Sequence, residues 1–172
     1  IRNRVITLGL FRILHKYGGV LMPNSMIMLR DFKPIHNEYL GNQGCYVGEF
    51  VCRNITSDII ETFPNMRLFG CQKRNAIVKE LCNYMEVMIS TDNSNESDFI
   101  GNLDRMINKF IRAGQLNKLS GNLLGTKDIH NKSVTIDELL NNSNIEFDVD
   151  VAGIYLPKDE LLKRRKYNWF LR

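Results

Sequence analysis

The first seventeen residues of the chain carry apolar side chains at helical spacing. This spacing predicts an amphipathic helix over residues 2–17, whose apolar face holds Ile6, Leu10, Ile13, Leu14 and Tyr17. Gly18 suits the left-handed position that often follows a helix. A short buried strand is expected at residues 20–22, a second extended piece at 26–29 and a loop at 31–34.

The middle of the chain predicts one strand and two further helices. The Gly-Asn-Gln-Gly run at 41–44 indicates a turn, and the strand expected at 45–52 carries Glu49. A break is expected at 62–65 and a short strand or loop at 66–70. Helices are expected at 73–89 and from a cap at Asn95 to Ala113, with a stop at Gly114.

The last third alternates short extended pieces with turns. A hairpin is expected from residues 123–127 and 132–136, a helical turn at 137–140 with Asp137 as its cap, and a strand at 145–154. Pro157 opens a final predicted helix at 158–172. The order of these elements predicts an α/β fold, a mixed sheet flanked by helices, in a single domain over residues 1–172.

Composition places the chain among ordinary globular proteins. Its 172 residues suffice for one domain, and 44% hydrophobic with 24% charged residues is typical of soluble proteins. No apolar run is long enough to cross a membrane, so we expect no membrane span. A net charge of +4 is too weak to argue for nucleic acid. Ile1-Arg2 resembles the interior of an element, so we expect that the start is missing.

Four cysteines, at 45, 52, 71 and 82, form no Cys-x-x-Cys pair. Their spacing gives neither a zinc framework nor a redox motif. Cys71 and Cys82 lie in apolar stretches, where small buried core residues are expected. This usage favours a reducing, intracellular compartment.

One string of residues resembles a known family. Arg12, Leu14, Tyr17, Gly18, Gly19 and Val20 are similar to the helix end and strand of glycosyltransferases related to capsular polysaccharide synthesis proteins and to yeast-type initiating mannosyltransferases. The core match covers about 25 residues of the chain, and segments 121–140 and 154–170 also resemble viral members of this group. In that family an acidic Asp-x-Asp or similar turn follows the strand. Here Pro23 and Ser25 stand at its two positions.

The resemblance implies a GT-A fold, of which this chain would be the C-terminal portion without its N-terminal nucleotide-binding part. It implies transfer of a hexose from a nucleotide-sugar to a glycan or protein acceptor, with Mn²⁺ or Mg²⁺ on the diphosphate. Such ions prefer carboxylate oxygens. Proline offers no ligand, and Asn24 and Ser25 offer only neutral oxygens, so the cofactor is doubtful.

Three interpretations follow from the missing acids. In the first, the protein is an enzyme that takes its metal ligands from elsewhere in the chain, with Asp31 or Glu49 as candidates. In the second, it binds a sugar or nucleotide without turnover. In the third, it is a pseudoenzyme that serves as a structural subunit of a virion or an organellar complex. Under the first two, Tyr17, Gly18, Gly19, Asn24 and Ser25 contact the donor. Glu49 is the candidate catalytic base, against the alternative of a solvent-facing residue on an edge strand.

Other chemistry-bearing residues have simpler explanations. Asp92, Glu96 and Asp98 could bind a cation, but helix capping explains them more economically. His15, His36 and His130 show no metal-ligand spacing. The basic and aromatic run at 163–170 could hold a diphosphate or RNA, whereas a basic helix end with packed aromatics is the ordinary interpretation.

Overall fold

The computed structural model describes residues 2–53, 60–91, 96–141 and 143–157. The elements in chain order are α1 (Arg2–Tyr17), β1 (Gly19–Leu21), β2 (Met26–Met28), α2 (Lys33–Leu40), β3 (Cys45–Arg53), β4 (Ile60–Cys71), α3 (Ala76–Ser90), α4 (Glu96–Arg112), β5 (Asn117–Leu119), α5 (Ile136–Leu140) and β6 (Gly153–Tyr155). The fold is therefore α/β, with a mixed sheet flanked by helices, as the sequence predicts. No helix of the described residues has the length and apolar character needed to span a membrane.

Contacts divide the chain into two compact units. Unit 1 comprises residues 1–22, 33–48 and 64–119, and unit 2 comprises residues 23–32, 49–63 and 120–172. The four-stranded sheet has the order β1-β4-β3-β5, in which β1 and β4 are antiparallel while β3 and β5 are parallel. In unit 2, β2 and β6 form an antiparallel pair that aligns Met26 with Tyr155.

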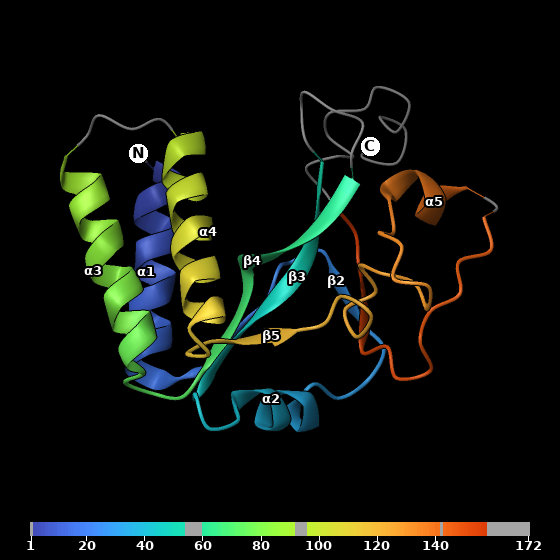
Figure 1. The fold of residues 1–172 in the computed structure, drawn as a ribbon, viewed down its shortest axis with the longest axis horizontal. Coiled ribbons are helices and arrows are strands. Elements are labelled where there is room, and N and C mark those ends of the chain that lie inside the picture. The colour runs from blue at the N-terminus through green and yellow to red at the C-terminus, as the bar shows by residue number, and fades with distance from the viewer. Residues whose placement is uncertain (1, 54–59, 92–95, 142, 158–172) are drawn as a thin grey trace. The chain divides into compact units, whose positions relative to one another are not determined.

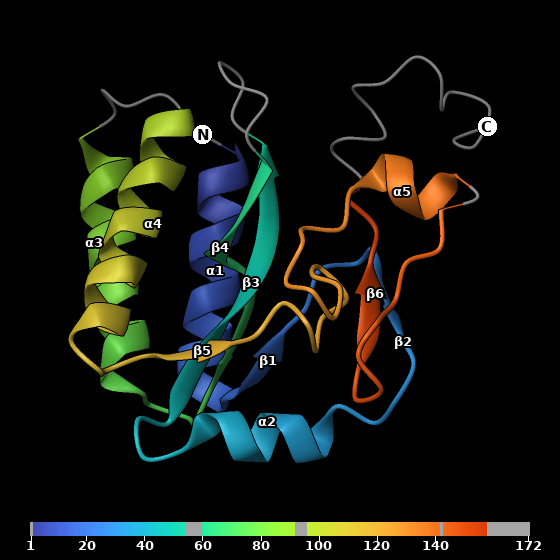
Figure 2. The same ribbon diagram turned by 45° about the vertical axis from the view of Figure 1, so that its right-hand side comes forward.

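In unit 1, α1, α3 and α4 lie together on one side of the sheet (Figures 1 and 2). Their apolar faces meet the sheet in one core that includes Phe11, Phe69, Leu81, Met85 and Leu103, all buried. The rings of Phe11 and Phe69 meet edge to face with centroids 5.3 Å apart. Burial of this apolar surface is the main source of stability for the unit.

The helix α1 has the predicted bounds, but the predicted apolar face is wrong at four of its five positions. Its buried side chains include Leu8, Phe11 and Leu14. Of the five side chains expected inside, Leu14 is buried as predicted. The other four are exposed, with relative exposures of 51% for Ile6, 40% for Leu10, 58% for Ile13 and 67% for Tyr17. Both faces of this helix carry apolar residues, so periodicity alone does not decide which one packs.

Several boundaries also differ from the sequence prediction. The strand β1 is an exposed edge strand rather than a buried one, α2 starts inside the expected 31–34 loop, and β4 continues through the expected break at 62–65. The predicted hairpin reduces to a turn with one bridge between Lys127 and Ser133. The strand β6 occupies only the end of the expected strand 145–154.

Helix caps explain where three helices begin and end. The side chain of Asn75 accepts from the amides of Ile77 and Val78, so α3 begins three residues later than expected. Thr135, not Asp137, caps α5 through a capping box with Glu138. Gly114 follows α4 at φ +70° and ends it as predicted. The cap expected at Asn95, the side chains at 96–98 and the helix expected at 158–172 lie outside the described residues.

Candidate functional site

The end of α1 has the geometry that the Tyr-Gly-Gly string predicts. Gly18 adopts φ +73°, and its amide donates to the carbonyl of Leu14 at 2.8 Å. A Cβ at this position would lie 2.7 Å from the backbone nitrogen of Lys73. Gly18 is therefore required both by its left-handed conformation and by the close approach of a second chain segment.

The neighbouring positions serve different purposes. Gly19 also has a positive φ, +103°, but a Cβ there would meet nothing within 4 Å. Glycine is thus favoured at position 19 by the backbone conformation and not by a lack of space. Tyr17 is exposed, and the ammonium of Lys16 lies 5.1 Å from the centroid of its ring. These three candidate donor-binding residues belong to unit 1.

The polar turn after β1 belongs to unit 2 and holds the other two candidate donor-binding residues. The amide of Met26 donates to the carbonyl of Pro23 at 3.1 Å, which closes a four-residue turn around Asn24 and Ser25. The carbonyl of Ser25 accepts from the amide of Leu156 at 3.0 Å. Among the described residues, no hydrogen bond uses the side chains of Asn24 or Ser25, so both are available to a ligand.

This turn does not fit a hard divalent cation. Pro23 supplies no ligand, and the side-chain oxygens of Asn24 and Ser25 are neutral. In the part of the chain that the structure describes, no group of three or more His, Cys, Asp or Glu residues is placed to hold a metal ion. We therefore assign no step to a metal.

Glu49, the candidate base, lies on β3 and is buried, with its side chain 5% exposed. The ammonium of Lys127 lies 2.9 Å from its Oε2, and the amide of Gly121 donates to the same oxygen at 3.0 Å. The alternative of a solvent-facing residue on an edge strand is wrong, because β3 lies between β4 and β5 in the sheet.

The partners of Glu49 come from one loop, residues 120–127. The hydroxyl of Thr126 donates to the backbone carbonyl of Glu49 at 2.9 Å. A Cβ on Gly121 would lie 2.4 Å from this hydroxyl oxygen, so only glycine fits beneath it. Lys127 is 78 positions from Glu49, and nothing in the sequence pattern signals that pairing. These contacts give Glu49 a role in anchoring the loop.

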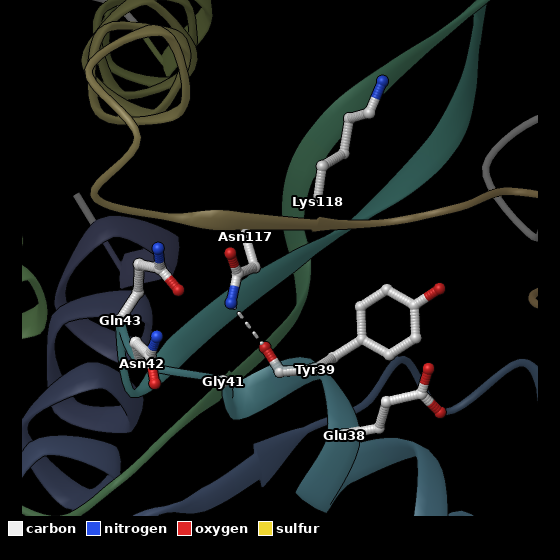
Figure 3. Close-up of a pocket in the computed structure, with 7 residues that line it drawn as sticks. All are labelled: Glu38, Tyr39, Gly41, Asn42, Gln43, Asn117 and Lys118. Atoms are coloured by element: carbon white, nitrogen blue, oxygen red, sulfur yellow. Dashed lines mark hydrogen bonds between the residues drawn. The ribbon is translucent and has the colours of Figure 1, made fainter.

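Unit 1 also contains an open pocket of about 510 Å³ (Figure 3). Its lining residues are Glu38, Tyr39, Gly41, Asn42, Gln43, Asn117 and Lys118. The sequence predicts the turn at 41–44, but its role as a pocket wall depends on β5, which no sequence signal brings beside it.

The candidate residues are divided between the two units. Tyr17, Gly18 and Gly19 belong to unit 1, while the turn and Glu49 belong to unit 2. Comparisons of the chain with protein-family models, with curated proteins and with solved structures find no match.

Proposed function

We propose that this chain is a glycosyltransferase-like domain that transfers a hexose from a nucleotide-sugar to a glycan or protein acceptor. The observation that carries the proposal is the order helix, left-handed Gly18, strand β1 and polar turn, which the resemblance to glycosyltransferases implies. The turn presents two polar side chains with no partner among the described residues. It is therefore suited to hydrogen-bond a ribose or phosphate.

Donor recognition at this turn relies on neutral groups. The amide of Asn24 can both donate and accept, and the hydroxyl of Ser25 can do the same. Because neither is a carboxylate, we expect donor binding that does not depend on a divalent ion. Gly18 and Gly19 have positive φ angles where the chain leaves α1 and enters β1.

Isothermal titration tests this proposal with UDP-glucose and GDP-mannose as donors, in EDTA and in Mn²⁺. We expect millimolar or tighter binding of one donor in both conditions, and a loss of at least fivefold in Asn24→Ala. Asn83→Ala removes an exposed asparagine on α3 and is the matched control. Absence of binding of either donor at millimolar concentration would overturn the proposal.

The double variant Pro23→Asp/Ser25→Asp tests whether the turn can hold a divalent cation once the acids are restored. It places two carboxylates at the positions where the resemblance predicts acids. We expect this variant to bind the donor more tightly in Mn²⁺ than in EDTA, unlike the natural chain.

A second candidate function is a non-catalytic subunit of a larger assembly, and the position of Glu49 favours it. A carboxylate that is buried and paired with Lys127 is a poor base, because its charge is already stabilised by the protein. On this view Glu49→Gln lowers the free energy of unfolding by about 2 kcal/mol, because Lys127 loses its partner. If Glu49 is also the base, the variant loses donor turnover by orders of magnitude in addition to this loss of stability.

A further inference from the structure

The pocket between α2, the 41–44 turn and β5 has preformed walls (Figure 3). The side-chain nitrogen of Asn117 donates to the carbonyls of Tyr39 and Leu40, at 2.9 and 3.3 Å. The side-chain nitrogen of Gln43 donates to the carbonyl of Gly114 at 3.2 Å. Both amide groups are thus held in place through their nitrogens, which leaves their oxygens as acceptors.

Gly41 keeps the space between these two amides open. Its φ is +47°, and a Cβ there would lie 3.0 Å from the Asn117 nitrogen and 3.3 Å from the Gln43 oxygen. Any other residue would fill the gap between the two walls. The pocket therefore depends on the absence of a side chain at this position.

The lining combines hydrogen-bonding groups with one aromatic ring. Tyr39 is half-buried, and its ring meets that of Tyr46 edge to face, with centroids 6.2 Å apart. Because Tyr46 is fully buried, this contact restricts the Tyr39 ring. Glu38 and Lys118, which have opposite charges, lie on either side of Tyr39 in Figure 3, so the lining has no net charge.

This chemistry selects among classes of ligand. A pocket lining dominated by amide and charged groups disfavours an apolar ligand, and a lining without net positive charge disfavours a polyanion. A sugar ring presents an apolar C–H face and several hydroxyls, which match an aromatic ring beside amide and carboxylate oxygens. A volume of about 510 Å³ suits one or two such rings.

We propose that this pocket binds a neutral saccharide. The hydroxyls of the saccharide donate to the side-chain oxygens of Glu38, Gln43 and Asn117, and the C–H face of its ring packs on Tyr39. The inference does not rest on transferase activity, because a saccharide site serves either a transferase or an assembly subunit.

Two-dimensional ¹H–¹⁵N NMR of the whole chain tests the proposal, with the methyl glycosides of glucose, galactose, mannose and N-acetylglucosamine as probes. We expect one of them to shift the amides of residues 38–43 and 117–118, with a Kd of roughly 1–10 mM, as suits a single sugar in an open site. No shift with any of the four at 50 mM would overturn the proposal.

Variants of two pocket residues, with a control on α3, test whether the saccharide binds in this pocket. Tyr39→Leu keeps an apolar side chain but removes the flat ring, and Glu38→Gln removes a charged acceptor. Each is expected to weaken binding at least threefold, whereas Glu80→Gln, an exposed glutamate on α3, leaves it unchanged. Unfolding curves verify that each variant is folded. A titration with inorganic phosphate separates ligand classes: if phosphate shifts the same amides and the glycosides do not, the site binds anions and the proposal is wrong.

Discussion

Asp104 on α4 is a carboxylate in an unfavourable position. Its Oδ1 is buried and has no hydrogen-bond partner among the residues that the structure describes. Loss of solvent around the group raises its pKa from the ordinary 3.8 to about 6, although the positive charge of Arg67 acts in the opposite direction. The folded chain therefore binds a proton here more tightly than the unfolded chain does.

This raised pKa predicts how stability depends on pH. The folded state holds the extra proton between pH 4 and 6, so its stability falls as pH rises through that window and is constant above it. Asp104→Asn removes this pH-dependent loss of stability and should raise the free energy of unfolding by about 1 kcal/mol at pH 7. This value is smaller than the free energy that corresponds to the whole pKa difference, because the carboxyl group is only half-buried.

Urea unfolding of both chains at pH 4 and pH 7 measures the effect. The two chains should differ least at pH 4, where the natural carboxyl is mostly protonated in the folded state. An equal difference at both pH values would contradict the assigned cause.

At the level of elements, two glycines associated with α1 have opposite requirements. Gly9 lies inside the helix, and a Cβ there would meet nothing within 4 Å. Gly18 ends the helix at φ +73° and faces the backbone of Lys73 at close range. The same substitution should therefore have opposite effects at the two positions.

Gly9→Ala should raise the free energy of unfolding by about 0.5–1 kcal/mol, because alanine has the higher helix propensity. Gly18→Ala should lower it by about 2–4 kcal/mol, through backbone strain and the displacement of Lys73. Chemical denaturation followed by circular dichroism measures both. Equal effects of the two substitutions would contradict the close approach of Gly18 to the backbone of Lys73.

The elements themselves show what a sequence pattern can predict. The helix α1 and the strand β3 are predicted almost residue by residue, because their periodicity and bounding glycines are local signals. The strand β4 is cut short in the prediction because Pro64 lacks an N–H group and normally avoids interior strands. Its real extent depends on pairing with two neighbours, which is not a local property.

At the level of the whole molecule, three cysteines are buried in the core of unit 1. Burial raises the pKa of Cys45 to about 11 and of Cys71 to about 12, and it also raises the pKa of Cys82. These thiols are neither ionised nor accessible at pH 8 in the folded chain.

A Cys52→Ser background leaves these three thiols as the reporters. Their reaction with an aromatic disulfide reagent at pH 8 should be slow and should speed up with urea in proportion to the unfolded fraction, because the core must open before any of them reacts. Mass spectrometry assigns the labelled positions. Immediate labelling of Cys71 would show that the core opens locally.

The candidate site was predictable only in part. The Tyr-Gly-Gly end of α1 and the turn at Asn24 and Ser25 follow from neighbouring residues, and the structure forms both. The pairing of Glu49 with Lys127, and of Asn117 with the carbonyl of Tyr39 in α2, joins residues 78 positions apart in each case. Such pairings depend on how the elements pack, and a single sequence carries no local signal for them.

The division of unit 1 among residues 1–22, 33–48 and 64–119 sets an order of events during synthesis. The helix α1 leaves the ribosome before α3, against which it packs, and α3 is complete only at Ser90. Until then neither apolar face of α1 is covered by α3. The growing chain thus exposes the apolar side chains of α1 while residues 18–90 are synthesised, a period in which chaperones would be expected to bind it.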